Sequence, residues 1–285
     1  MKISGFTFVR NAVKFDYPVV AAITSILPLC DEVVVCVGKS EDDTLALIES
    51  IPSNKIRIVH SVWDDSLRKN GRVLAVETNK AFDAVAADAD WAFYIQADEV
   101  VHEKYLPVIK QAMAQYKDDR RVEGLLFKYV HFYGSYDYVG DSRTWYRHEI
   151  RIVRNNKTVR SYRDAQGFQK DGRKLHVKEI DAAIHHYGYV RNPHIMCAKQ
   201  SNLDQLYGEK VTFSADEMFD YSKVASLKLF EGTHPQVMRE RINRQDWDFT
   251  FDTTKNNLSL KGRILHFIEK KTGKRLFEYK NYTII

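Results

Sequence analysis

Short apolar runs alternate with segments of helical periodicity over the first 116 residues. Runs rich in β-branched and aromatic residues predict strands, and apolar residues recurring every three or four positions predict helices. Strands that alternate with helices imply crossover connections and a mostly parallel sheet buried on both faces. The predicted strands are 3–9, 32–37, 56–59 and 91–95, and the predicted helices are 17–27, 42–50, 73–87 and 102–116.

This pattern also predicts where a ligand binds. In open α/β sheets, ligands bind beyond the carboxyl ends of the parallel strands. We therefore expect the functional residues in the loops that follow Val9, Val37, Val59 and Ile95.

The second half of the chain has a different pattern. Residues 124–131, 150–153 and 181–189 predict strands, and the aromatic, glycine-containing stretch 133–146 predicts a loop between the first two. Beyond Pro193 the spacing predicts helices over 194–207, 215–230 and 235–243. We expect three parts, bounded as 1–130, 131–212 and 213–285, the last of them a helical C-terminal extension.

The last predicted helix, 258–271, is amphipathic and basic. Leu260, Ile264, Phe267 and Ile268 share one stripe, with lysine and arginine opposite. Such a helix packs on its own domain or lies on a membrane surface, and the sequence leaves both possibilities open.

Composition narrows the classes of partner. The 285 residues carry a net charge of +5, but no cluster of Lys and Arg is interleaved with stacking aromatics, so we do not expect nucleic-acid binding. Three cysteines in no metal-binding spacing, and an N-terminus that does not resemble a signal peptide, favour a reduced, cytoplasmic setting. Contact through the basic helix would place the protein at the inner face of the membrane.

The strongest local motif is Gln96-Ala97-Asp98-Glu99, directly after an apolar strand. A carboxylate at a strand's carboxyl end can hold Mg²⁺ or Mn²⁺ against a diphosphate, since hard cations bind one or two carboxylates plus substrate phosphates. The alternative is that Asp98 and Glu99 cap the helix beginning near His102.

Two upstream loops carry polar groups at neighbouring strand ends. The segment 38–44 could hydrogen-bond a nucleoside or could be a turn with an N-cap. The segment 7–11 would lie beside it or be an ordinary strand-to-helix turn.

Together the three segments resemble family 2 glycosyltransferases, which have the GT-A fold. The resemblance covers residues 2–130 and implies a nucleotide-sugar-binding half there and an acceptor-binding half in 131–212. It implies a divalent cation on Asp98. Cys36 and Val37 replace an acidic pair typical of the family, and Gln96 replaces an aspartate. The nucleotide-sugar contacts implied are Thr7, Phe8, Arg10, Asn11, Gly38, Ser40, Asp42, Asn79, Gln96, Ala97 and, from the segment described next, Arg191.

The segment 184–191 resembles a His-Tyr-Gly-x-Val-Arg sequence of a bacterial subgroup of that family. It implies that His186 is a second metal ligand or a diphosphate contact, although a lone histidine is commonly structural. Arg191 and Lys199 are candidate phosphate ligands.

An inverting transfer needs a carboxylate that takes the proton of the acceptor hydroxyl. The candidates are Glu149, beside a Trp-Tyr pair, and Asp164, with Asp141 as a third. Ion pairing of Glu149 with Arg147 or Arg151 is the structural alternative.

The resemblance thus implies a metal-dependent, hexosyltransferase-like enzyme that transfers a sugar from a nucleotide-sugar donor to a hydroxyl acceptor, a glycan or a lipid-linked sugar, in cell-surface polysaccharide or glycolipid synthesis. A non-catalytic nucleotide-sugar or glycan-binding protein is the alternative. A nucleotidyltransferase is less favoured, because residues 7–14 lack the glycines of a phosphate loop.

Overall fold

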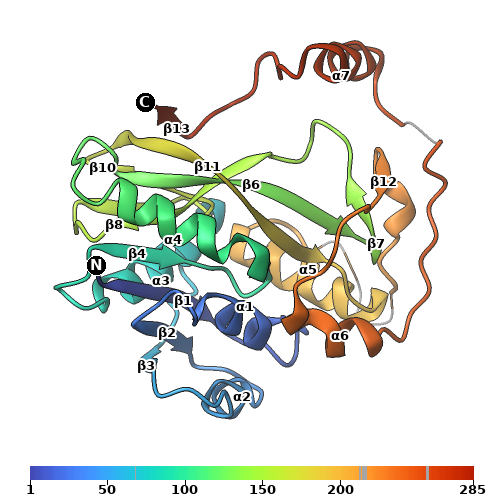
Figure 1. The fold of residues 1–285 in the computed structure, drawn as a ribbon. Helices are drawn as coiled ribbons and strands as arrows, with labels where there is room; N and C mark the ends of the chain where they lie inside the picture. The colour runs from blue at the N-terminus through green and yellow to red at the C-terminus, as the bar shows by residue number, and fades with distance from the viewer. Residues whose placement is uncertain (68, 212, 214–216, 255–256) are drawn as a thin grey trace.

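The computed structural model describes residues 1–67, 69–211, 213, 217–254 and 257–285. It is a mixed α/β protein built on one large, curled sheet (Figure 1). The main strand order is β3-β2-β1-β4-β8-β6-β11-β10-β9. The predicted α/β class is therefore confirmed.

The first four strands are parallel and form one half of the sheet. They are β1 (Ile3–Val9), β2 (Glu32–Gly38), β3 (Ile56–Ser61) and β4 (Trp91–Tyr94). The helices α1 (Val19–Ile26), α2 (Thr44–Glu49), α3 (Arg72–Asp83) and α4 (Leu106–Gln115) follow them in turn. The alternation predicted from the sequence is confirmed, so the ends of these strands meet at one edge.

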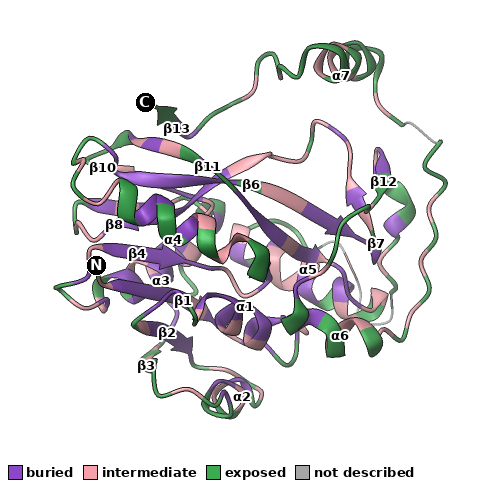
Figure 2. Cartoon of the chain, in the orientation of Figure 1, coloured by how far each residue is buried: buried purple, intermediate pink, exposed green. Residues whose placement is uncertain are grey.

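The core lies on both faces of this half. In β2, Val33 and Val35 belong to a cluster with α1 and α4, whereas Val34 and Cys36 pack in a cluster with α3. Helices cover each face, and β1, β2 and β4 between them are buried along nearly their whole length, whereas the edge strand β3 is partly exposed (Figure 2). This double burial explains the near-continuous apolar character of β2.

The second half joins the first through an antiparallel strand. β8 (His148–Arg154) pairs antiparallel with both β4 and β6 (Gly124–Tyr133), and the long β11 (Arg173–Tyr189) pairs parallel with β6. The sequence did not predict four of the shorter strands: β5 (Glu99–Val101), β9 (Val159–Tyr162), β10 (Gly167–Lys170) and β13 (Tyr282–Ile284).

Two expectations for the second half are wrong. The predicted loop 133–146 contains β7 (Ser135–Gly140), which folds back on β6 at Gly134, a residue with φ of 75°. In the predicted helix 215–230, residues 215 and 216 lie outside the described part. The rest is irregular apart from a 3-10 turn, Tyr221–Lys223, and β12 (Leu227–Leu229). Pairing of β12 with β7 overrides the helical spacing.

The remaining helices are α5 (Pro193–Tyr207), α6 (Arg239–Asn243) and α7 (Leu260–Thr272). Short 3-10 turns at Lys69–Gly71, Glu103–Tyr105 and Gln236–Met238 precede α3, α4 and α6. Across the described ranges, none of these helices has the length and apolar character needed to cross a membrane.

A buried ion pair joins the two halves of the sheet. Arg151 on β8 donates from Nε and Nη2 to the two carboxylate oxygens of Glu99, at 2.8 and 2.7 Å, and neither side chain is exposed. The Tyr129 hydroxyl donates to the same carboxylate at 2.8 Å, and the backbone N–H of Gln96 does so at 3.1 Å. Glu99 therefore anchors the segment 96–99 and does not cap a helix. His102 caps the next turn instead, by accepting from the Lys104 amide.

We expect Arg151→Met to destabilise the protein by about 3–5 kcal/mol, because it leaves Glu99 as an uncompensated buried charge. The free energy of unfolding from urea titration measures this. Lys128→Met breaks the exposed pair with Asp181 and should leave the free energy of unfolding almost unchanged. Equal effects of the two substitutions would contradict the anchoring role.

Candidate active site

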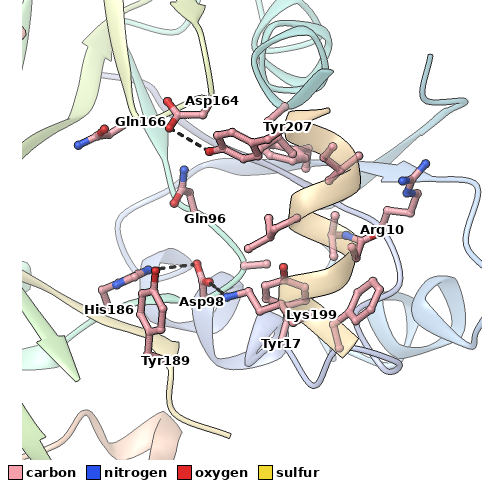
Figure 3. A pocket seen from close by; sticks show the side chains of 18 of the residues that line it. Arg10, Tyr17, Gln96, Asp98, Asp164, Gln166, His186, Tyr189, Lys199 and Tyr207 are labelled. Carbon is pink, nitrogen blue, oxygen red and sulfur yellow. Dashed lines mark hydrogen bonds and ion pairs between the residues drawn. The ribbon is translucent and has the colours of Figure 1, made fainter. Parts of the chain in front are cut away.

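A cavity of about 250 Å³ opens at the carboxyl ends of β1 and β4 (Figure 3). The segment after β4 forms one wall, the end of β11 another, and α5 a third. Helix α5 starts at Asn192-Pro193, where the Asn192 side chain accepts from the His194 amide, and ends at Gly208 in the left-handed region. The predicted residues that line this cavity are Phe8, Arg10, Gln96, Ala97, Asp98, Asp164, His186 and Lys199.

Asp98 is buried at the inner end of the cavity beside a lysine. Lys199 on α5 donates to Asp98 Oδ2 at 3.1 Å and to the Gly188 carbonyl at 2.8 Å. Burial alone would raise the pKa of Asp98, but Lys199 and the other basic groups around it outweigh burial and hold that pKa well below its usual range. Burial and the charge of Arg191 lower the pKa of Lys199. Asp98 is thus an ionised carboxylate at neutral pH.

Arg191 lies just beyond β11, fully buried behind the cavity wall. Its guanidinium carbon is 5.2 Å from the centre of the Tyr17 ring. Within the part of the chain that the structure describes, none of its three guanidinium nitrogens has a hydrogen-bond partner. Buried charged groups are normally paired, so an orphaned guanidinium indicates an absent anion. Lys199 and Arg191 both act on the charge of Asp98, and when Lys199 is protonated the cluster carries one excess positive charge.

Hydrogen bonds set the tautomer of His186. His131 Nε2 lies 2.8 Å from the Tyr146 carbonyl, which can only accept, so this nitrogen carries the proton. Burial lowers the pKa of His131 to about 3, so the ring is neutral and its Nδ1 accepts from His186 Nδ1, 3.1 Å away. His186 Nε2 is left with a lone pair that faces Asp98 Oδ1 at 3.8 Å.

These two facing acceptor atoms fit a divalent cation. A carboxylate oxygen and a neutral imidazole nitrogen are both good ligands, and a second histidine that orients the first is a common arrangement. In the described residues no group of three or more His, Cys, Asp or Glu could hold a metal. The chain would therefore offer two ligands and leave the remaining positions to phosphate oxygens and water.

The loops after β1 and β2 are clasped together. Asn11 has a φ of 55°. Its side-chain oxygen accepts from the backbone N–H of Glu41 at 2.8 Å, and its backbone N–H donates to Ser40 Oγ at 3.0 Å. Asp42 accepts from the Lys14 amide at 2.7 Å. Thr7 is buried inside β1. The polar groups of these residues hold the loops in place, outside the lining of the cavity.

Trp63, which follows β3, forms the far wall of the cavity and was not predicted. The Arg10 guanidinium lies 4.2 Å over its ring, and a Cβ on Gly38 would come within 2.3 Å of its indole nitrogen. Gly38 is therefore needed for the close approach of Trp63. Trp63 lies just after β3, one of the parallel strands at whose carboxyl ends ligand-binding residues are expected.

Two further predicted residues have local partners. Asn79 on α3 lies away from the cavity and exchanges two hydrogen bonds with the backbone of Ser161. The Gln96 side chain lines the cavity and donates to the Tyr94 hydroxyl and the Ala165 carbonyl, both at 3.3 Å.

A second cavity, of about 490 Å³, adjoins the first. Asp164 lines both and accepts from the Tyr207 hydroxyl at 3.0 Å. It is therefore placed where a molecule in one cavity would meet a molecule in the other. The residues that line both cavities are Tyr146, Asp164, Gln166 and Tyr207.

Glu149 lines only the second cavity. It accepts from Gln166 at 2.6 Å and from Asn281 at 2.9 Å, and burial raises its pKa to about 7. The alternative of an ion pair with a neighbouring arginine is wrong, since Arg151 pairs with Glu99 and Arg147 with Glu278. The third candidate, Asp141, pairs with Lys270 at 3.2 Å.

Tyr207 was not predicted from the sequence, and Lys199 was predicted only as a candidate phosphate ligand, not as the partner of Asp98. The α5 residues that line the first cavity recur at helical spacing, and this periodicity is the signal that could have found them. They are Met196, Lys199, Asn202, Leu203, Leu206 and Tyr207.

Glu149→Gln should change the pH dependence of stability. Between pH 4.5 and about 7 the native state holds more protons at Glu149 than the unfolded chain, so the free energy of unfolding falls as pH rises through this window. The cost of ionising the buried group reaches on the order of 3 kcal/mol. Relative to wild type, the variant should gain stability between about pH 5 and about pH 8 in urea titrations. A pH-independent difference would show that Glu149 titrates normally.

Comparison with known proteins gives similarities at the level of structure only. No protein-family model and no curated protein matches the sequence. The structure is similar to a crystal structure of residues 1–349 of S. aureus TarS, with a TM-score of 0.41 and 14% identity over 72% of this chain and 65% of that one. The chain thus spans less than two thirds of that protein fragment.

Two other solved structures are also similar. One is glucosyl-3-phosphoglycerate synthase from Mycobacterium tuberculosis in complex with Mn²⁺, UDP and phosphoglyceric acid, with a TM-score of 0.31 and 17% identity over 46% of this chain and 43% of that one. The other is 4-diphosphocytidyl-2C-methyl-D-erythritol synthase from Anaerococcus prevotii, with a TM-score of 0.34 and 12% identity over 54% and 70% of the two chains.

Proposed function

We propose that this protein is an inverting glycosyltransferase that moves a sugar from a nucleotide-sugar donor to a hydroxyl acceptor. One observation carries the proposal: a buried cluster with excess positive charge, Asp98, Lys199 and Arg191, lies at the strand ends beside two adjoining cavities. An anionic ligand with a sugar attached fits a charged inner end and a larger adjoining cavity. We infer that residues 1–130 form the nucleotide-sugar-binding half, to which His186, Arg191 and Lys199 are added from 131–212. The rest of 131–212 would form the acceptor-binding half, and 213–285 would extend it.

The negative charge of the donor diphosphate would neutralise the positive charge of the cluster. Lys199 would bind the diphosphate oxygens, Arg191 would add positive charge from behind the cavity wall, and a Mn²⁺ or Mg²⁺ ion on Asp98 and His186 would neutralise the leaving diphosphate. The nucleoside would then lie toward Arg10 and Trp63, near the clasped loops. This arrangement stabilises the charge that develops as the bond from the sugar to the diphosphate breaks.

Asp164 is the residue we assign as the base. In a single displacement, its carboxylate takes the proton of the acceptor hydroxyl as that oxygen attacks the anomeric carbon. The bond from this carbon to the diphosphate oxygen breaks on the opposite face, and the electron pair leaves with the diphosphate. The position of Asp164 in the lining of both cavities supports the assignment. Glu149, whose two oxygens already accept hydrogen bonds, holds Gln166 in place.

We propose that such an enzyme acts in the synthesis of a cell-surface polysaccharide or glycolipid. A non-catalytic protein that binds nucleotide sugars is the second candidate, and the buried cluster would serve it equally well. The two candidates differ in turnover, so measuring sugar transfer by the wild-type protein separates them.

A thermal-shift panel of UDP-, GDP-, dTDP- and CMP-sugars, with and without Mn²⁺, tests donor binding. The correct donor should raise the melting temperature in a concentration-dependent way, because a ligand that binds only the native state stabilises it. Asp98→Asn should remove the part of the shift that depends on Mn²⁺. If no donor gives a shift in the wild-type protein, the proposed function is wrong.

Asp164→Asn should bind the donor normally and transfer sugar at a rate lower by about a hundredfold or more, the usual contribution of a general base. Turnover is measured as release of the nucleotide diphosphate. Glu149→Gln is the matched control, an isosteric change in the neighbouring carboxylate, and should retain most of the activity. The reverse ranking would assign the base to Glu149, and no turnover in wild type with intact binding would favour the non-catalytic candidate.

His131→Phe should weaken Mn²⁺ binding by about 10–100-fold, since it removes the acceptor that fixes the tautomer of His186. The readout is the Mn²⁺ concentration that gives half of the thermal shift with the nucleotide diphosphate. His60→Phe, at an exposed position on β3, is the control. Unchanged Mn²⁺ dependence in His131→Phe would sink the ligand role of His186.

A further inference from the structure

The apolar stripe of α7 points away from the protein. Leu260, Ile264 and Phe267 are 77%, 54% and 63% exposed, although they lie on one face at the spacing typical of a buried stripe. Ile268, the fourth residue of the stripe, is half-buried. Helix α7 stands apart from the sheet, and its outer surface is exposed (Figures 1 and 2).

The polar face of α7 is the one that contacts the domain. Glu269 accepts from Arg143 at 3.0 Å, and Lys270 donates to Asp141 at 3.2 Å. The helix is therefore inverted relative to an ordinary surface helix, which buries its apolar face and exposes its polar one. The sequence left two possibilities open for this helix, packing on its own domain or contact with a membrane surface. The helix does pack on the domain, but through ion pairs, and most of its apolar stripe stays exposed.

The segment that follows α7 extends the exposed apolar surface. Phe277 is 90% exposed, and Leu276 and Tyr279 are also exposed beside it. Eight of the fifteen exposed large apolar side chains found in the described residues lie after residue 259, so the exposure is concentrated and is not the usual scatter. We call α7 and residues 273–285 the C-terminal ridge.

The charge of the chain is concentrated in the same place. Residues 258–285 hold seven lysines and arginines against two glutamates, a net charge of +5, which equals the net charge of the whole chain. The rest of the protein is formally neutral. Lys261, Lys271 and Lys274 are exposed around the apolar stripe. An apolar stripe ringed by lysines matches a surface that is apolar inside and anionic outside.

The ridge also borders the second cavity. Arg275, Phe277 and Tyr279 line it, as do Arg143 and Arg147, which bind the inner face of α7. A surface bound by the ridge would thus lie next to the cavity where the acceptor is expected.

We propose that the C-terminal ridge docks the protein on an anionic membrane surface and that the acceptor is a lipid-linked sugar reached from that surface. The first part stands on the ridge alone, and the identity of the acceptor rests on the proposed function. A second copy of the chain is a poorer occupant of the stripe. A symmetric dimer would bring the same lysines face to face, whereas anionic headgroups neutralise them.

Flotation of the full-length protein with lipid vesicles tests the docking. Wild type should float with vesicles of equimolar phosphatidylcholine and phosphatidylglycerol at low salt, and much less with phosphatidylcholine alone or at high salt. Ile264→Glu/Phe267→Glu should lower the apparent affinity by about a hundredfold, because two apolar side chains no longer enter the interface. Lys261→Gln/Lys271→Gln/Lys274→Gln should lower it by a similar factor, on the order of a hundredfold.

The matched control is Met218→Glu/Val237→Glu, which places the same charges at two exposed apolar positions outside the ridge and should leave flotation unchanged. Equal flotation of wild type and the ridge variants, or no flotation of wild type, would overturn the proposal. So would a wild-type dimer in light scattering that Ile264→Glu/Phe267→Glu converts to a monomer, without vesicle binding in either.

The donor-induced thermal shift separates this proposal from the proposed function. It should be the same in wild type and in the ridge variants, which lie outside the donor cavity. Vesicle binding without any donor shift would support docking and overturn the glycosyltransferase assignment. A donor shift without vesicle binding would do the opposite.

Discussion

The buried ion pair between Glu99 and Arg151 is the interaction on which the site depends. It joins the end of the parallel half of the sheet to the antiparallel strand β8, and it fixes the segment 96–99. Since Glu99 is bound on the interior side, its neighbour Asp98 is directed into the cavity. Two adjacent carboxylates thus have different roles, one neutralised by an arginine and one held beside a lysine.

The charge balance around Asp98 distinguishes the site from an ordinary buried pair. One carboxylate with one lysine would be neutral and could serve stability alone. Arg191 adds a second cation whose nitrogens have no partner in the described chain, and a buried unpartnered guanidinium is costly unless a ligand completes it. The hydrogen-bonded series from the Tyr146 carbonyl through His131 to His186 adds a nitrogen lone pair on the other side of Asp98. Together these features favour a phosphate ligand and a cation over a purely structural cluster.

The C-terminal part of the chain contributes to the second cavity in two ways. Asn281, next to β13, hydrogen-bonds Glu149, so the end of the chain helps to build the second cavity. The ridge formed by α7 and the residues after it then borders the opening of that cavity. A helix that packs by its charged face and exposes its apolar face is difficult to explain by the stability of the isolated domain, and it is explained by contact with a surface of matching chemistry.

The sequence by itself determined the parallel half of the fold and the place of the site. Local periodicity sets strands and helices one at a time, and the strand-end rule then brings Phe8, Arg10, Gln96 and Asp98 to one edge. Tertiary structure alone decided the rest. The strands β5, β9, β10 and β12 exist because a partner strand accepts their hydrogen bonds, and the helix expected over 215–230 yielded to such pairing. The state of Asp98, the orphaned Arg191 and the inverted face of α7 all depend on which residues distant in sequence lie beside them, and no local pattern records that.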